Sequence, residues 1–404
     1  MTNTPSQGQS LDSVDHHSEY FLNHNYEIYD ELRQRCPVSH STAWDGFWLF
    51  TDYDVTYQAA QDTDTFSSRP QKGVPMASDA VFIPIDSDPP LLREYRNIVL
   101  PYLSPSAAKE FEPKFREMAH RLIDEFIEDG KADIVAQLTT PLPAIWMLRM
   151  LGFDESRWTD WVEWIHAVVH ERSADPEKAG VAITKIYTNI TQEIDRRRSE
   201  GFGNDLFSVI MQGQAADRAL SDDEVLSFGF QLLLGGLDTT SGLVGNTLIQ
   251  LDEHRDLRER LITEPQLLRS ATEEFLRHST PVQGVYRLVA QDCQVGGQHL
   301  KAGDRLTLLY AAANRDPKIF DNPAAIDLDR KAIRHLAFGV GPHRCLGSNH
   351  ARVMFQVMIS LILERLPDYS ISGPVERFPD AGDVYAVRHL PITFQPGSRV
   401  HPRT

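Results

Sequence analysis

Three cysteines, a deficit of basic residues and the lack of any long apolar run set the first limits on this 404-residue sequence. Cys36, Cys293 and Cys345 are an odd, sparse set, which is typical of a reduced cytoplasmic protein and argues against a disulfide framework. No apolar stretch approaches the roughly 18 residues that a transmembrane helix needs. The first 20 residues are polar and acidic, so they do not read as a secretory signal.

The charge balance excludes further classes of protein. Lys and Arg number 40 against 57 Asp and Glu, which gives a net charge of −17. A general nucleic-acid binder needs a basic surface, and so does a protein that adheres to an anionic membrane. Hydrophobic residues make up 41 %, as is ordinary for a globular protein. We expect a flexible lead over residues 1–18 and a single domain over residues 19–404.

Hydrophobic periodicity and turn residues predict a mainly α fold with small β-sheets. A segment rich in proline, residues 67–87, should be a long irregular connection, and such loops are often functional. Ser104-Pro105 predicts the start of a helix that runs towards Gly130, and Ser221 with Glu224 has the spacing of a capping box. The expected elements are helices at residues 25–34 and 55–60, mostly helix over 91–213, a long helix after 221, and strands at 47–52, 283–290, 304–310 and near 385–394.

The most informative segment is HLAFGVGPHRCLGSNHAR, residues 335–352. Gly339 and Gly341 precede Cys345, and Gly347 follows it, directly before an amphipathic helical pattern. This places Cys345 at a helix N-terminus, where the dipole favours a thiolate. The glycines permit a tight turn and close approach of the backbone to a flat cofactor. A lone cysteine is more often a small buried side chain, which is how we interpret Cys36 and Cys293.

The segment fits the pattern F-G-x-G-x-H-x-C-x-G at every fixed position and resembles the haem-binding loop of the cytochrome P-450 family. The fixed positions are Phe338, Gly339, Gly341, His343, Cys345 and Gly347. The resemblance implies a single-domain P-450 fold with haem b as the cofactor. Cys345 would be the axial iron ligand, whose thiolate favours O–O cleavage. His343 would hydrogen-bond a haem propionate.

Other motifs of the same family follow in the expected order, across roughly residues 88–352. LLLGGLDTT, residues 232–240, places two glycines inside a helix, either for close packing or for a distortion that opens a groove for dioxygen. By the resemblance, Asp238 and Thr239 are the acid–alcohol pair that delivers protons on the distal side. Thr240 is the weaker candidate for the alcohol. An isolated Asp-Thr pair would more often be a polar helix turn.

Two arginines and an ion-pair motif complete the resemblance. Glu274 and Arg277 resemble the E-x-x-R pair, which is a folding element, with Arg330 as its third member. Arg287 and Arg96 match propionate-binding arginines. A position that is often polar in the family is Leu92 here, so one propionate contact is missing or supplied differently, with Arg93 as a candidate.

Residues 330–352 contain five Arg or Lys and three His but no Asp or Glu, which is a local reversal of charge. Some of these cations could be internal. The functional interpretation is a basic face near the thiolate side of the haem, at Arg334, Arg344 and Arg352, that steers an acidic electron donor. A ferredoxin fits best and a flavodoxin is the alternative. The sequence has no G-x-G-x-x-G run, so we expect NAD(P)H to act through separate proteins.

Alignment with the family predicts a mainly aliphatic substrate pocket. This favours an apolar substrate such as a terpenoid, a steroid or polyketide skeleton, or an aromatic. The predicted lining residues are Met76, Phe82, Leu233, Leu234, Leu237, Val282, Val285, Tyr385 and Val387.

The leading interpretation is a monooxygenase that inserts one oxygen atom of O2 into this substrate. One alternative is a peroxygenase that takes hydrogen peroxide directly, although the Asp238–Thr239 pair argues against it. The other is a haem protein that senses a gas or ligand, which would need neither the acid–alcohol pair nor a basic docking face.

Overall fold

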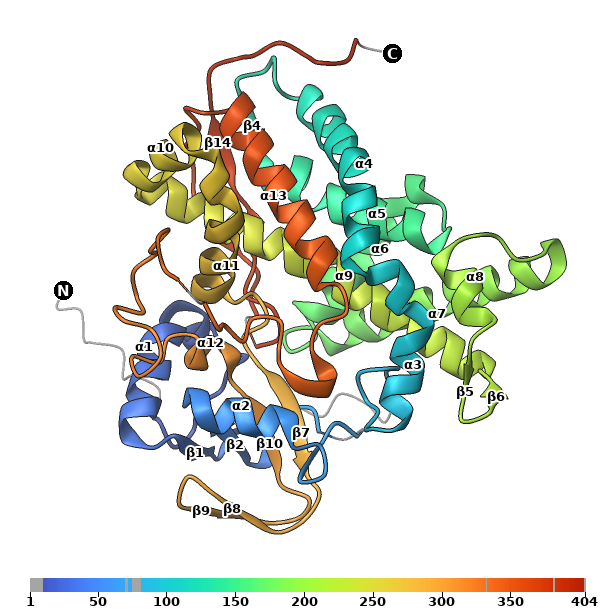
Figure 1. The fold of residues 1–404 in the computed structure, drawn as a ribbon, viewed down its shortest axis with the longest axis vertical. Coiled ribbons are helices and arrows are strands. Elements are labelled where there is room, and N and C mark those ends of the chain that lie inside the picture. The colour runs from blue at the N-terminus through green and yellow to red at the C-terminus, as the bar shows by residue number, and fades with distance from the viewer. Residues whose placement is uncertain (1–9, 70–71, 75–80, 332, 381, 403–404) are drawn as a thin grey trace.

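The computed structural model describes residues 10–69, 72–74, 81–331, 333–380 and 382–402 of the chain. Helices dominate, as Figure 1 shows, and a smaller β-rich part lies at the lower left of that view. The predicted mainly α fold with small β-sheets is therefore confirmed. None of the described helices combines the length and apolarity that crossing a bilayer requires.

Most of the helices form one large group around a long central member, α9 (Asp222–Glu253), and the remaining ones lie with the main sheet. The others are α1 (Glu19–Arg35), α2 (Tyr53–Gln61), α3 (Leu91–Val99), α4 (Pro105–Asp124), α5 (Pro141–Leu151), α6 (Trp158–Val169), α7 (Pro176–Glu200), α8 (Leu206–Met211), α10 (Arg255–Thr263), α11 (Leu268–Ser279), α12 (Tyr310–Ala313) and α13 (Ser348–Arg365).

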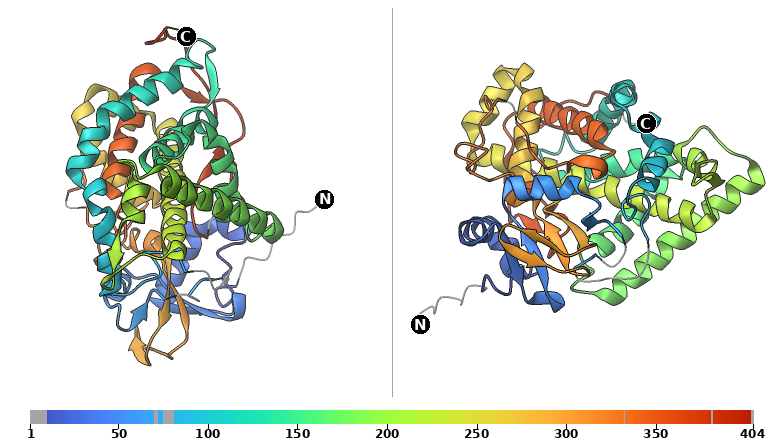
Figure 2. Two further views of the ribbon diagram at one scale, coloured as in Figure 1. Left: turned by 90° about the vertical axis from the view of Figure 1, so that its right-hand side faces the viewer. Right: turned by 60° about the horizontal axis from the view of Figure 1, so that its bottom comes forward.

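The main sheet has the strand order β1-β2-β10-β7-β3, with α1 and α2 beside it (Figure 2). Its strands are β1 (Val38–Ser41), β2 (Phe47–Phe50), β3 (Phe66–Ser67), β7 (Val285–Val289) and β10 (Arg305–Leu308). Among these described strands, β2 and β10 pair in parallel and the other neighbours pair antiparallel. The smaller sheets contain β4 (Lys131–Asp133) with β11 (Ser370–Ile371) and β14 (Pro391–Thr393), β5 (Gln214–Ala215) with β6 (Arg218–Ala219), β8 (Cys293–Val295) with β9 (Gln298–Leu300), and β12 (Glu376–Arg377) with β13 (Val387–His389).

Both predicted helix starts are present. Ser221 and Glu224 form a complete capping box at the start of α9, so two otherwise unpaired N–H groups are satisfied. The Ser104 hydroxyl accepts a hydrogen bond from the N–H of Ala107 at the start of α4. That helix ends at Asp124 rather than continuing to Gly130, and a series of turns fills the interval before β4.

The N-terminal segment corrects one prediction. Residues 10–18 are not a loose lead but pack against the body of the protein, with Val14 only 1 % exposed. His17 hydrogen-bonds the carboxylate of Asp380 at 2.7 Å and the carbonyl of Val74 at 2.7 Å. Contacts across such sequence distances leave no local signal, so a polar segment looked flexible. Residues 1–9 lie outside the described residues.

Candidate active site

The Cys345 loop folds back on itself immediately before α13. The backbone N–H of Cys345 donates to the carbonyl of Phe338 at 2.7 Å. Gly339 and Gly341 have φ of 66° and 74°, a region that side chains other than glycine rarely adopt. A Cβ on Gly341 would also lie 2.9 Å from the carbonyl oxygen of Ala60. The two glycines therefore shape the turn that presents the cysteine.

Cys345 itself is accessible, although protein surrounds it. Burial raises the pKa of its thiol, while the N–H of Gly347 and the charges of Arg96 and Arg344 act in the opposite direction. The helix begins at Ser348, three residues further on, and its N-terminus does not outweigh burial. Burial therefore opposes the thiolate that the nearby positive groups favour, and a bound metal ion would complete its stabilisation.

Three basic groups gather near this loop. Arg287 points from β7 into the protein and is 2 % exposed, and its guanidinium hydrogen-bonds the carbonyl of Tyr286. Arg96 of α3 donates to the carbonyl of Arg344 at 2.5 Å. Nε2 of His343 lies 3.0 Å from the Ser68 hydroxyl. Burial, then the charges of Arg287 and Arg96, lower the pKa of His343 to about 3.

These three groups lack an anionic partner within the described part of the chain. No carboxylate there forms an ion pair with Arg96, Arg287 or His343, and burial lowers the pKa of both arginines. A buried cation without a counter-charge is costly. The arrangement therefore suits an anionic ligand, such as the two propionates of a haem.

Lys72 is a further basic group at this place, and the sequence did not indicate it. The Lys72 ammonium pairs with Asp86, and its charge lowers the pKa of His343. Leu92 is buried and has no polar group to offer a propionate, and Arg93, the expected substitute, is exposed on α3. Lys72 lies in the connection over residues 67–87, which was predicted to be irregular. That prediction was the only sequence feature that pointed to this part of the site.

The backbone leaves room for a flat group beside Cys345. A Cβ on Gly347 would meet no atom within 4 Å, and one on Gly235 of α9 would meet only the Gln231 amide at 4.0 Å. Gly235 is exposed although α9 is the central helix. The Phe338 ring, below the Arg352 guanidinium at 4.5 Å, borders the loop. A sulfur ligand, unpaired cations and open glycines together fit haem.

The two adjacent glycines of α9 have different roles. A Cβ on Gly236 would lie 2.1 Å from the Cε of Met147 in α5, so this glycine permits close helix packing. Gly235 faces open space instead. Close packing is thus seen at Gly236, whereas α9 is continuous through Gly235 and the groove for dioxygen stays a prediction.

Asp238 and Thr239 follow on the same helix and point to different partners. Asp238 is 2 % exposed and accepts a hydrogen bond from Nε2 of His166 at 2.9 Å. Burial would raise the pKa of Asp238, but the charges of His166 and His170 and the hydrogen bond from His166 lower it well below its usual range. The Thr239 hydroxyl donates to the carbonyl of Gly235 at 3.1 Å. Thr240 is buried.

The E-x-x-R residues form a buried ion-pair group. Arg277 makes two hydrogen bonds to the Glu274 carboxylate, and neither side chain is accessible. Arg330 donates to the same carboxylate at 3.0 Å. Glu274 also accepts the N–H of Asp327 at 2.9 Å, so it anchors the chain that leads to the cysteine loop.

The basic segment is partly neutralised by α11. Arg352 donates two hydrogen bonds, at 2.6 and 2.7 Å, to Glu273, which also pairs with His335. Burial would raise the pKa of Glu273, but these partners lower it to about 2. Arg352 is therefore not a free docking cation, a correction to the predicted set. Arg334, Arg344 and Lys331 stay exposed.

The predicted pocket residues separate into two groups. Phe82, Leu234, Val282 and Val285 keep partial exposure, and Phe82 stacks on Phe230 at 5.2 Å. Met76 lies outside the described residues. The others belong to the core: Leu233 and Leu237 are 0 % exposed, and Val387 is 2 % exposed. Fully buried side chains border no open space, so these three do not line a pocket.

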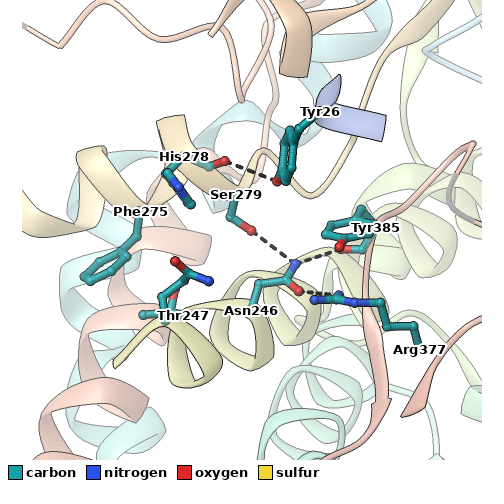
Figure 3. A pocket seen from close by; sticks show the side chains of 9 residues that line it. Tyr26, Asn246, Thr247, Phe275, His278, Ser279, Arg377 and Tyr385 are labelled. Atoms are coloured by element: carbon teal, nitrogen blue, oxygen red, sulfur yellow. Dashed lines mark hydrogen bonds between the residues drawn. The ribbon is translucent and has the colours of Figure 1, made fainter. Parts of the chain in front are cut away.

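Tyr385 faces a different cavity, of about 60 Å³ (Figure 3). Its ring lies 4.2 Å from the Arg377 guanidinium, and its carbonyl accepts a hydrogen bond from the Asn246 amide at 2.9 Å. Asn246 also accepts from Arg377 at 2.8 Å and contacts the Ser279 hydroxyl at 3.1 Å. This small polar cavity lies on the C-terminal half of α9 and is too small for the predicted apolar substrate.

The chain is similar over most of its length to proteins of one family. A family model described as Cytochrome P450 matches residues 136–367. Linalool 8-monooxygenase of Pseudomonas putida is 27 % identical over 87 % of this chain and 91 % of its own length. Steroid C26-monooxygenase of Mycolicibacterium smegmatis is 30 % identical over 93 % of this chain and 94 % of its own length. The crystal structure of CYP109E1 from Bacillus megaterium in complex with testosterone superposes with a TM-score of 0.87 at 28 % identity, covering 94 % of this chain and all of that one.

Proposed function

The chain belongs to the cytochrome P450 family of haem b-binding monooxygenases, and on this premise we propose its site residues, substrate class and electron donor. Cys345 would ligate the haem iron. Arg96, Arg287 and His343 would hold the propionates, with Lys72 as a further cation. The single observation that carries the assignment is the accessible Cys345 sulfur near the buried Arg287 and the half-buried Arg96 and His343, none of which forms an ion pair within the described residues.

The bound haem supplies dioxygen activation, which the cysteine thiolate promotes by donating electron density to the iron. The protein contributes position and protons. Asp238 is the carboxylate that exchanges protons, and Thr239 supplies a hydroxyl one residue further along α9. Gly235 keeps the neighbouring turn of the helix open towards the haem.

The substrate is an apolar small molecule. The accessible predicted lining, Phe82, Leu234, Val282 and Val285, is apolar. Two relatives are named for linalool and for a steroid, and a solved relative holds testosterone. A terpenoid or steroid skeleton is thus the first class to test, followed by polyketide and aromatic compounds.

Electrons come from NAD(P)H through a separate reductase and an acidic ferredoxin. The supporting feature is a set of exposed cations before and within the cysteine loop, Lys331, Arg334 and Arg344. They stand out in a chain of net charge −17. Such a patch raises the association rate of an acidic partner and orients it.

Turnover under labelled dioxygen tests the proposal. The haem-loaded protein is supplied with NADPH, a surrogate ferredoxin and its reductase, and a panel of terpenoids and steroids that shift the haem spin state. We expect hydroxylated product with one oxygen atom from O2. Product formed only with hydrogen peroxide would establish the peroxygenase instead, and tight ligand binding without product from either oxidant would favour a sensor.

A further inference from the structure

A histidine pair surrounds the Asp238 carboxylate on the side that faces α6. His166 lies in the last turn of α6, and His170 is the residue that caps this helix. Nε2 of His166 is 2.9 Å from Oδ1 of Asp238, and Nε2 of His170 is 3.3 Å from Oδ2. Each imidazole therefore lies next to a different oxygen of the Asp238 carboxylate. No local sequence pattern indicates this arrangement, because the pair lies about 70 residues before Asp238 and joins it only in the fold.

The two histidines differ in access to solvent. The His166 side chain is 21 % exposed and makes a well-formed hydrogen bond to the carboxylate. The His170 side chain is 0 % exposed, its two ring nitrogens lack a hydrogen-bond partner among the described residues, and its ring stacks on Phe378 at 3.8 Å with an angle of 7°. His166 contacts the same phenyl ring edge-on at 4.7 Å. One ring thus connects the carboxylate with the exterior, and the other lies next to it on the inside.

We propose that His166 passes protons from solvent to Asp238 and that His170 is the buried positioning residue that holds the carboxylate for this exchange. The inference rests on the proposed function, in which Asp238 supplies protons to the haem site. It adds the route by which Asp238 is recharged.

The proton count of the exchange is balanced. His166 takes up a proton at Nδ1 from hydronium in the solvent, which leaves water, and releases the Nε2 proton to Oδ1 of Asp238. The products are a neutral imidazole and a neutral carboxylic acid, and because the histidines hold the pKa of Asp238 low, this acid releases its proton readily. Loss of the acid proton to the reaction restores the carboxylate, and return of a proton from Nδ1 to Nε2 through water resets the ring. No electrons move in these steps.

The surrounding charges do not replace the histidines. Arg388 lies over Phe378 at 6.0 Å, on β13, and also approaches Glu171 at 3.6 Å. Glu171, next to His170, pairs with Lys178 of α7. On α9 the neighbouring hydroxyl of Thr239 is turned to its own helix. Among the described residues, the charges that bear on Asp238 are therefore those of the two imidazoles.

His166→Gln is the discriminating variant. The glutamine amide nitrogen reproduces the Nε2 donor, so the hydrogen bond to Asp238 and the fold are kept, while passage of a proton through the side chain is lost. We expect product formed per NADPH to fall about tenfold or more. The solvent deuterium isotope effect on turnover should rise, and substrate affinity should not change. His120→Gln on α4 removes a histidine remote from Asp238 and is the matched control. His170→Gln should misplace the carboxylate, and Asp238→Asn removes the acceptor.

Exchange of the ring N–H protons gives a readout independent of turnover. In the diamagnetic reduced carbon monoxide complex with ¹⁵N-labelled histidine, the signals absent from His166→Gln and from His170→Gln identify the two rings. We expect the His166 N–H to exchange rapidly with water and the His170 N–H to be protected. Should His170→Gln fail to fold, His166→Gln still carries the test.

The possible results distinguish failure of the histidine proton route from failure of the proposed monooxygenase function. Wild-type coupling and isotope effect in His166→Gln, with Asp238→Asn impaired, would overturn the histidine route and leave Asp238 in place. A protected His166 N–H would overturn it as well. Wild-type behaviour of Asp238→Asn would remove the inference together with the role of Asp238. Failure of the wild-type protein to form thiolate-bound haem would instead refute the proposed function.

Discussion

Arg277 binds Glu274 through two parallel hydrogen bonds, of 2.8 Å from Nε and 2.7 Å from a terminal nitrogen, and both side chains are wholly buried. Arg277 also donates to the carbonyls of Asn314, Pro323 and Ala325. The pair thus fastens α11 to the chain that follows α12. The role of this ion pair is structural, because the remaining N–H groups of Arg277 donate to backbone carbonyls of the segment that leads to the cysteine loop.

Glu274→Gln should destabilise the protein by about 3–5 kcal/mol, because two buried guanidinium groups lose their counter-charge. Urea unfolding measures the loss. Glu273→Gln is the matched control, since its carboxylate holds Arg352 and His335 from a position that is 29 % exposed, and it should cost clearly less. Equal losses for the two variants would contradict the account of Glu274 as a buried anchor.

Local signals in the sequence predicted the elements and the cysteine loop, since caps, turn glycines and Cys345 are neighbours along the chain. Tertiary partners were beyond that reasoning. His17 reaches Asp380 and His166 reaches Asp238 only after folding. Whether a leucine of α9 faces a cavity or the core depends on the rotation of the helix, so Leu233 and Leu237 were misplaced while Leu234 is accessible.

Stability should fall as the pH rises above about 6.5, through the folded-state pKa of His17. Burial would lower this pKa, but the hydrogen bond to Asp380 and the charge of Asp383 raise it, and the carbonyl of Val74 accepts from the other ring nitrogen. The folded state then binds the His17 proton more tightly than the unfolded state does. The stabilisation from the protonated His17 is therefore complete below a pH of about 6.5 and is lost as the pH rises above the raised folded-state pKa. His17→Gln should show a flatter dependence of Tm on pH. An unchanged dependence would contradict this role.

Charge reversal at Arg334 and Arg344 should weaken the ferredoxin interaction. Both side chains are exposed, so Arg334→Glu with Arg344→Glu should raise the KM for ferredoxin by about tenfold or more and reduce its salt dependence. Steady-state turnover at varied ferredoxin and salt measures this. Substrate-induced spin-state shifts should be unaffected. A KM equal to that of the wild type would place the docking surface elsewhere.

Gly236→Ala should be less favourable than Gly235→Ala by about 0.5–1.5 kcal/mol, because the new methyl group would lie 2.1 Å from Met147 Cε and this flexible side chain would have to change its rotamer. Gly235→Ala meets no such contact, and the higher helix propensity of alanine should make it neutral or stabilising by up to about 1 kcal/mol. Thermal unfolding compares the two. Adding Met147→Ala should remove the difference in steric cost, and a double-mutant cycle without coupling would contradict the packing explanation.

The most direct test of the account is the absorption spectrum of the dithionite-reduced protein with carbon monoxide. Thiolate ligation by Cys345 predicts a strongly red-shifted Soret band in the wild type and in Cys36→Ala and Cys293→Ala, and its loss in Cys345→Ala. A band typical of histidine ligation in freshly prepared wild-type protein, or a red-shifted band that survives in Cys345→Ala, would contradict the central claim.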